Sequence, residues 1–264
     1  MVALKRGQEP HIVETGNPKH LISVLREYER PLIYTSPAIL NIIAQLLPKE
    51  GRLFAAMTSG TLLPDPWFAK IREKTTHLFQ QYGCSEAGCV AINPNLQRAE
   101  DMGFPLPHIQ LITEDNPDNA GDIIVIRQNG AEISTRDLGY QRADGMLVFV
   151  SRLDDMINVA GLNVYPKDVE DVVMQMPGVT DAVVFRRKDQ FSGERPAVLF
   201  SGTEDVTPNA VRNWCSKNLA AHQFPTTIQR VAHVPRQANG KISRRAVSDA
   251  FERGDFQSHP LKGL

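Results

Sequence analysis

The chain has 264 residues, of which 42% are hydrophobic and 22% charged, with a formal net charge of -1. These values are typical of globular proteins, and this length favours two domains over one large one. The charge balance indicates neither a nucleic-acid partner nor an anionic membrane surface. Three cysteines without C-x-x-C or zinc-site spacing favour a reducing, cytoplasmic compartment. Neither a signal-peptide core nor a membrane span is expected from the sequence.

The first 83 residues alternate between helical and extended patterns. Helices are expected over residues 18–30, 36–50 and 64–75, and strands over residues 31–35, 52–59 and 77–83. Such alternation favours parallel pairing of the strands.

After Gly121 the pattern changes to short strands separated by Asn-Gly and Asp-Gly turns, which indicates an antiparallel region. A helix over residues 166–176, strands over 181–188 and 195–202, and a helix from residue 207 follow. With a boundary near residues 151–155, the sequence predicts an α/β sheet with a small antiparallel β region, followed by a smaller α+β part.

Two segments place polar residues where expected strands end, which is where sites are usually built. In YGCSEAG (82–88), Tyr82 can stack on a base, Ser85 can contact a phosphate and Glu86 can bind Mg²⁺. In STRDLGY (134–140), Asp137 can accept hydrogen bonds from both hydroxyls of a ribose. Alone, each also has a simpler explanation as a turn with a solvated or turn-forming acid.

Two further segments lie in the second half. SRLDDMINVAGLNVYPKDVE (151–170) sets Arg152 beside Asp154 and Asp155, which by itself indicates only an exposed ion pair. PRQANGKISRR (235–245) places Lys241 after a glycine and before basic residues. A single Gly-Lys pair is compatible with a solvated loop. None of the four segments decides a function separately.

Together the four segments resemble the adenylate-forming superfamily of acyl-CoA synthetases, peptide-synthetase adenylation domains and luciferases. The order that carries the resemblance is Tyr-Gly-x-Ser-Glu, Ser-Thr-x-Asp, Arg-x-Asp-Asp-x-Ile-x-x-x-Gly-x-x-Val-x-Pro-x-x-Val-Glu and Pro-Arg-x-x-x-Gly-Lys-Ile-x-Arg. SGTLLP (59–64) is also similar to the adenine-pocket segment of that family. The resemblance implies that residues 1–151 are the C-terminal portion of the large domain, 152–155 a hinge, and 156–264 a small mobile domain.

The resemblance implies an ATP-dependent carboxylate ligase, which forms acyl-AMP and then transfers the acyl group to the thiol of CoA or of a phosphopantetheine on an acyl carrier protein. It makes Lys241 and Glu86 catalytic, with Glu86 binding Mg²⁺, and makes Asp154 the hinge. Gly161 is expected to let a loop approach the acceptor thiol, and Gly240 to give the lysine loop its flexibility. The residues to which the resemblance assigns nucleotide or acceptor binding are Gly60, Thr61, Tyr82, Gly83, Ser85, Asp137, Arg152 and Gly161.

The sequence departs from the family in one large respect. It does not contain the Ser/Thr/Gly-rich loop ending in lysine that wraps the β- and γ-phosphates, so it resembles only the C-terminal half and is expected to be inactive alone. An engineered fragment, a proteolysed species and a natural half that needs a separate N-terminal chain remain open. Smaller departures are Arg136, which could crowd the nucleotide or contact a phosphate, Ser151 and Asn158.

Alternative functions also remain. The chain could be a non-catalytic binding module or scaffold, or one half of a split adenylating enzyme. A peptide-synthetase adenylation domain is less favoured because no Leu-Gly-Gly-x-Ser carrier signature follows Lys241. The carboxylic acid is not indicated, although Met57, Cys84, Gly88 and Cys89 are expected to contact it.

Overall fold

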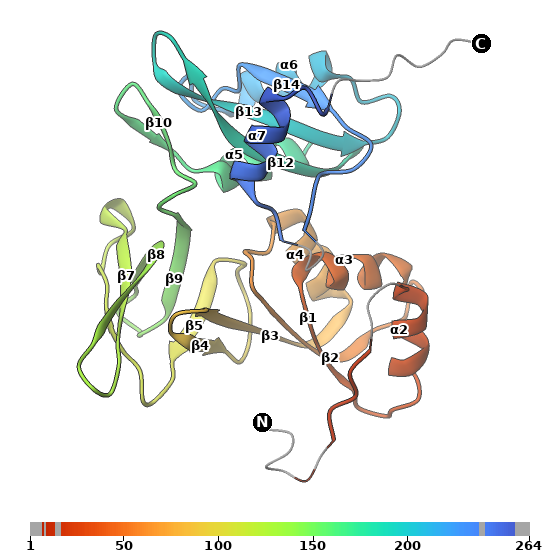
Figure 1. The fold of residues 1–264 in the computed structure, drawn as a ribbon. Coiled ribbons are helices and arrows are strands. Elements are labelled where there is room, and N and C mark those ends of the chain that lie inside the picture. Colours follow the sequence, from red (N-terminus) through yellow and green to blue (C-terminus); the bar gives the residue numbers. More distant parts are fainter. Residues whose placement is uncertain (1–6, 8, 14–16, 238–240, 257–264) are drawn as a thin grey trace.

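A computed structural model describes residues 7, 9–13, 17–237 and 241–256. In these residues the chain forms two β-sheets, each with helices packed against it, and the two lie one above the other in Figure 1. The arrangement confirms the predicted α/β class with a second α+β part.

Most helices begin at a proline, whose fixed φ and missing N–H suit the first helical turn. The elements in chain order are α2 (Pro18–Leu25), β1 (Leu32–Thr35), α3 (Pro37–Leu46), β2 (Leu53–Ser59), α4 (Asp65–Glu73), β3 (Thr75–Cys84), β4 (Gly88–Asn93), β5 (Asp101–Pro105), β6 (Gln110–Ile112), the 3-10 helix η1 (Pro117–Asn119), β7 (Gly121–Ile126), β8 (Glu132–Gln141), β9 (Leu147–Arg152), β10 (Ile157–Val159), β11 (Leu162–Val164), α5 (Pro166–Met174), β12 (Val179–Asp189), β13 (Gly193–Gly202), α6 (Pro208–Asn218), β14 (Thr227–Arg230) and α7 (Arg244–Glu252).

The larger sheet has the strand order β1-β2-β3-β4-β5-β9-β8-β7-β6. Strands β1, β2 and β3 pair in parallel, as the alternation predicted. Helices α2, α3 and α4 supply the apolar side chains that pack with this part of the sheet in one core. The carboxyl ends of β2 and β3, where ligand sites commonly form in such sheets, point toward the second part of the molecule.

Two local expectations were wrong. Antiparallel pairing begins at β4, which pairs with β3, and not after Gly121. The reason is the tight turn at residues 85–87, which is too short for the crossover that a parallel strand requires. Helix α2 ends at Leu25 and not at Arg30, and turns and bends occupy residues 26–30; Pro31 disfavours helical geometry at Arg30 and so sets only an outer limit to the helix.

The smaller sheet has the order β11-β10-β13-β12, with β14 paired in parallel to β13. Its short strands β10, β11 and β14 were not predicted. Successive residues of β12 point to opposite faces, so Val184 packs with α5 and α6 while Phe185 packs with α7. Both faces are therefore buried, and α7 is fixed on the face opposite to α5.

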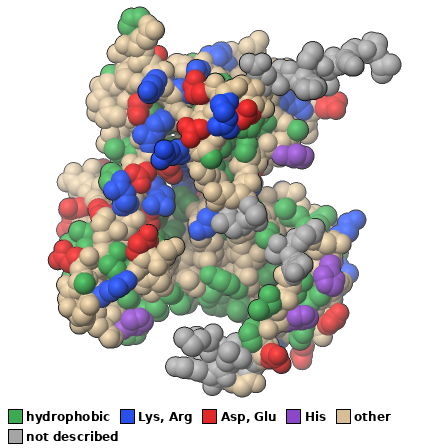
Figure 2. Space-filling model, in the orientation of Figure 1, with side chains coloured by type: hydrophobic (Ala, Val, Ile, Leu, Met, Phe, Trp, Pro, Cys, Tyr) green, Lys and Arg blue, Asp and Glu red, His purple; other side chains and the backbone are tan. Residues whose placement is uncertain are grey.

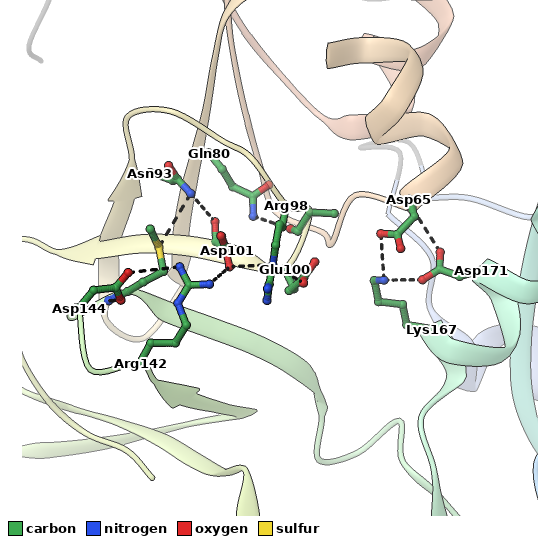
Figure 3. A network of polar contacts seen from close by, with 12 residues as sticks. Asp65, Gln80, Asn93, Arg98, Glu100, Asp101, Arg142, Asp144, Lys167 and Asp171 are labelled. Carbon is green, nitrogen blue, oxygen red and sulfur yellow. Dashed lines mark hydrogen bonds and ion pairs between the residues drawn. The ribbon is translucent and has the colours of Figure 1, made fainter. Parts of the chain in front are cut away.

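Residues 153–156 connect β9 of the larger sheet to β10 of the smaller one. A second junction lies at α4, whose first turn meets α5 (Figures 1 and 3). Within the described residues, no helix has the length and apolar character needed to cross a membrane.

Candidate functional site

A cavity of about 360 Å³ opens between the two parts of the molecule. Figure 2 shows a hollow at this junction with lysine and arginine side chains along it. Nine of the residues predicted to be catalytic or to bind nucleotide line the cavity: Gly60, Thr61, Tyr82, Gly83, Ser85, Glu86, Asp137, Arg152 and Lys241. Gly161 and Asp154 are not among its lining residues.

Tyr82, Asp137 and Arg152 form a connected polar group in this cavity. The Tyr82 hydroxyl donates to Asp137 Oδ2 over 2.9 Å, and Arg152 Nε lies 3.4 Å from Asp137 Oδ1. Strand pairing explains the second contact, because Asp137 on β8 is directly opposite Arg152 on β9. Thr135 supports the group by donating to Ile123 O and receiving the Asp137 N–H.

Burial changes the acidity of this group. Asp137 is 8% exposed, and desolvation raises its pKa above the ordinary value, although the Tyr82 hydrogen bond and the Arg152 charge oppose that rise. Burial and the neighbouring Asp137 charge also raise the pKa of Tyr82 far above its usual value. Tyr82 therefore remains a hydrogen-bond donor to an acid that sits at the cavity wall.

Lys241 reaches this cavity from the smaller part of the molecule. Its Cε lies 3.0 Å, and its Nζ 3.5 Å, from the position that a Cβ on Gly60 would occupy. Gly60 has φ +91°, a left-handed conformation that suits glycine. The absent side chain at residue 60 thus leaves the space through which the lysine stem passes. Gly240 lies outside the described residues.

The β3–β4 turn presents Ser85 and Glu86 at the same cavity. Gly83 permits the turn, since a Cβ there would come within 2.1 Å of Gly88 O. A hydrogen bond from its own backbone N–H lowers the pKa of Glu86, which is therefore ionised at neutral pH. Arg127 donates to the Glu86 carbonyl and fixes the turn from β7. No group of three or more His, Cys, Asp or Glu suited to a metal occurs among residues that the structure describes.

Arg136 was expected either to crowd the nucleotide or to contact a phosphate, and its position in the structure matches neither expectation. Its φ is +58°, which explains why a glycine is usual here, and its guanidinium pairs with both carboxylate oxygens of Asp154. Its N–H donates to Asp122. Arg136 is not a lining residue of the cavity. The residue predicted to be the hinge is therefore joined to β8 of the larger sheet.

Gly161 lies at the β10–β11 turn, outside the cavity lining. It has φ +89°, and a Cβ built on it would meet nothing within 4 Å. The Asn158 side chain accepts a hydrogen bond from the Gly161 N–H at 2.9 Å, which gives that departure from the family a local role. The turn geometry accounts for the glycine here without any contact to a ligand.

Of the four residues expected to contact the carboxylic acid substrate, one lines the cavity and three do not. Cys84 lines the cavity, whereas Met57, Gly88 and Cys89 are not among its lining residues. Burial raises the pKa of the Cys84 thiol, so it is a neutral, apolar part of the wall at physiological pH.

The sequence reasoning missed the contacts that hold the two parts together. Trp67 on α4 stacks under Arg236, whose guanidinium carbon is 4.8 Å from the indole centroid, and Arg236 also forks onto Asp181. The indole N–H reaches Thr180 O at 3.4 Å. Arg236 stood in the recognised Pro-Arg-x-x-x-Gly-Lys pattern without a role, but nothing in the sequence linked it to Trp67.

A second interdomain contact involves Lys167, shown in Figure 3. Its Nζ lies 3.2 Å from Asp65 Oδ1 on α4 and pairs with Asp171 one turn along α5. Asp171 Oδ1 also accepts the Asp65 backbone N–H at 3.2 Å. The start of α4 is therefore fixed to α5 by both charge and a helix-terminal hydrogen bond.

Residues 168–241 match the family model described as AMP-binding enzyme C-terminal domain. The chain is 37% identical over 245 residues to a 3,4-dihydroxybenzoate--[aryl-carrier protein] ligase of Bacillus anthracis, covering 93% of this chain and 58% of that protein. It is 24% identical to a 2-succinylbenzoate--CoA ligase of Lactococcus lactis, covering 89% of this chain and 55% of that one.

Solved structures agree on the fold. ATP-bound MatB from Rhodopseudomonas palustris superposes with a TM-score of 0.78 at 19% identity, over 89% of this chain and 53% of that chain. The amide bond synthetase McbA from Marinactinospora thermotolerans gives 0.77 at 24% identity, over 90% of this chain and 56% of that one. The chain thus spans between half and three fifths of the length of these relatives.

Proposed function

We propose that this chain, which matches the C-terminal half of an adenylate-forming enzyme, is part of an ATP-dependent carboxylate ligase. Such a ligase forms acyl-AMP and then passes the acyl group to a thiol. The observation that carries the proposal is the approach of Lys241, from the smaller part, to Gly60 in the cavity that also holds Tyr82 and Asp137. A binding module that lacked this chemistry would have no need of a cation across that cavity.

In the first step, a carboxylate oxygen of the acid attacks the α-phosphorus of ATP, and the bond to the β-phosphate breaks to release pyrophosphate. The ammonium of Lys241 opposes the negative charge that gathers on the reacting oxygens. A unit charge at about 4 Å contributes roughly 4 kcal/mol at a protein-like dielectric. Ionised Asp137 accepts hydrogen bonds from the ribose hydroxyls, and Tyr82 and Arg152 hold the Asp137 carboxylate in place.

The described residues fit a magnesium ion that is held mainly by substrate phosphates. Mg²⁺ commonly takes only one or two protein carboxylates in such sites, and Glu86 supplies one ionised carboxylate at the cavity. The ion would neutralise phosphate charge there. Ser85 lies beside Glu86 and presents a hydroxyl to the same phosphates.

In the second step, the thiolate sulfur of CoA or of a carrier phosphopantetheine attacks the acyl carbon, and AMP leaves. We assign residues 152–155 as the hinge about which the smaller part turns between the steps. Gly161 is on the β10–β11 turn and outside the present cavity, which is the placement expected if it faces the acceptor only after that rotation. The Arg136–Asp154 pair would hold the first orientation.

The relative that is 37% identical to this chain indicates a substrate class to test. Because that relative acts on 3,4-dihydroxybenzoate and an aryl-carrier protein, an aromatic acid and a carrier-bound thiol are the first substrates to test here. The three free cysteines accord with a reducing cytoplasm.

The β1 edge offers a surface for the remainder of the ligase. β1 is the terminal strand of the nine-stranded order, and Leu32 and Tyr34 on it are 56% and 55% exposed. An open strand edge with large apolar side chains is a surface for further pairing. We propose that the N-terminal portion of the ligase, in the same polypeptide or as a separate chain, packs there. This chain together with that portion is called the complete ligase below.

Calorimetric titration with AMP tests the nucleotide site on the chain as it is. We expect weak, saturable binding that Asp137→Asn reduces, because the substituted amide cannot accept from both hydroxyls as a charged carboxylate does. A scaffold would give no heat of binding with either protein. Pyrophosphate exchange by the complete ligase over a panel of aromatic and aliphatic acids then tests the reaction and its substrate class.

A further inference from the structure

Arg244 lies at the start of α7, three residues after Lys241, and its guanidinium is enclosed by two acids from other elements. It forks onto Glu170 of α5, with Nη2 3.0 Å from Oε2 and Nη1 close to Oε1. Its Nε is 3.5 Å from Oδ2 of Asp155, the last residue of the proposed hinge. Two parallel bonds from a planar guanidinium fix direction as well as distance.

Glu170 is itself held rigidly. Its Oε1 accepts the Val184 N–H of β12 at 2.7 Å, and Arg244 Nη1 donates to Val184 O at 3.3 Å. The pair therefore joins α5, β12 and the beginning of α7 at one point. The side chains of Glu170 and Arg244 are only 12% and 19% exposed, so water competes little with these bonds.

The chain between this point and Lys241 is short and has its own anchors. Ile242 packs against the core under α7, and Ser243 caps the helix by accepting the Ala246 N–H. On the other side, the Gln237 N–H donates to Lys241 O at 2.8 Å. Arg244 and Lys241 line the same cavity. Only Ile242 and Ser243 separate Arg244 from Lys241, and both are packed or bonded to α7, so a shift of the start of α7 at Arg244 also moves Lys241.

We propose that Arg244, clasped by Glu170 and Asp155, is a positioning residue that sets where the Lys241 ammonium stands during adenylation. This inference rests on the proposed function and adds the contacts that position the catalytic Lys241. Arg244 acts through Lys241 and through its contact with Asp155 of the proposed hinge, which aligns the lysine loop with the larger part in the present orientation. Thioester formation from ready-made acyl-AMP does not require that alignment.

The experiment uses the complete ligase and separates the two half-reactions. For Arg244→Gln we expect the rate constant of pyrophosphate exchange to fall about 10²-fold, the loss typical of a catalytic group misplaced by about 1 Å. The KM for ATP and the rate of thioester formation from supplied acyl-AMP should stay within about twofold of the wild-type values. Arg244→Lys keeps the charge but cannot form two parallel hydrogen bonds to Glu170. Its rate constant of pyrophosphate exchange should lie between those of the wild type and Arg244→Gln.

Glu170→Gln tests the clasp from its other side. The decreases in the rate constant of pyrophosphate exchange caused by Glu170→Gln and by Arg244→Gln should not add in the double variant, because both substitutions remove the same clasp. Arg187→Gln is the matched control, since Arg187 pairs with Glu252 near the far end of α7 in a more exposed contact. This control should leave both half-reactions unchanged.

The outcomes separate three cases. Equal loss of both half-reactions in Arg244→Gln, or full activity in both, overturns the positioning role. A wild-type complete ligase that shows no pyrophosphate exchange with any acid overturns the proposed function itself. If Arg244→Gln fails to fold, as its thermal transition would show, Arg244→Lys and Glu170→Gln are measured in the same way, and equal loss of both steps in these overturns the inference.

Discussion

The Tyr82 hydroxyl donates to the Asp137 carboxylate across 2.9 Å, although the two residues come from β3 and β8. The bond joins the last parallel strand of the larger sheet to its antiparallel region, at the wall of the cavity. It orients the acid and opposes the rise in the pKa of Asp137 that burial causes. Much of the chemistry proposed for the nucleotide depends on this pair.

Removing the donor should weaken nucleotide binding. In Tyr82→Phe the carboxylate loses a hydrogen bond worth about 1.5 to 3 kcal/mol when the partner is charged, so we expect the Kd for AMP to rise on the order of 10-fold. Calorimetric titration at constant pH measures it. Tyr34→Phe is the control, because Tyr34 bonds Ser59 on the exposed β1 edge. An unchanged Kd in Tyr82→Phe would contradict the role given to the bond.

The pKa of Asp137 sets an expected pH dependence. Because its pKa is raised in the folded chain, the native state binds this proton more tightly than the unfolded state does. Its contribution to the free energy of unfolding therefore declines as pH rises from the unfolded pKa through the raised folded pKa, and is regained on acidification.

AMP binding should show the opposite trend, since it needs the ionised acid. Affinity for AMP is expected to fall as the pH is lowered through the raised pKa of Asp137. In Asp137→Asn the remaining affinity should lose that dependence. Titrations over a pH series check both expectations, and an identical pH profile in the two proteins would refute the assignment of Asp137.

Gly60 and Gly88 offer a matched pair of substitutions. Both have positive φ, so alanine at either position strains the backbone, but only a Cβ at residue 60 meets Lys241. We expect Gly60→Ala to lower pyrophosphate exchange in the complete ligase on the order of 10-fold relative to Gly88→Ala, because the lysine stem is displaced. Equal activities would show that Lys241 does not need this passage.

Lys167 is expected to hold the two parts in their present orientation. Lys167→Met removes the ammonium between Asp65 and Asp171 and leaves the buried Asp171 without that charge partner. The fraction of molecules in which Trp67 contacts Arg236 should fall. This would change the fluorescence of Trp67, measured in a Trp214→Phe background, and increase the radius of gyration in X-ray scattering. Lys188→Met, at an exposed position near the end of β12, should change neither quantity.

The hinge assignment predicts a division between the half-reactions. Asp154→Pro restricts φ at the pivot and should preserve pyrophosphate exchange while stopping thioester release. Arg136→Gln serves as its control, because it removes the ion pair to Asp154 without stiffening the backbone. Thioester formation should continue in that variant. Equal loss of both steps in Asp154→Pro would rule out the hinge.

The sequence predicted the larger features because their signals are local. Alternating apolar periods indicated the parallel β1–β3 unit, and the order and spacing of four motifs indicated the family and the catalytic and nucleotide-binding residues that line the cavity. Long-range contacts escaped prediction. Nothing near Trp67 indicates Arg236, and nothing near Arg136 indicates Asp154, since each pair is chosen by the packing of separate elements. The early antiparallel turn at residues 85–87 was missed because its residues also suit a binding loop.

In the proposed reaction, Lys241 closes over a nucleotide held by Tyr82 and Asp137. This closure can be measured by acetylation footprinting of Lys241, read by mass spectrometry with and without a non-hydrolysable acyl-adenylate analogue. We expect the saturated analogue to slow labelling of Lys241 several-fold while leaving Lys188 unchanged, and Asp137→Asn to require more analogue for the same protection. Labelling of Lys241 at one rate, with the analogue bound and without it, would contradict this closure.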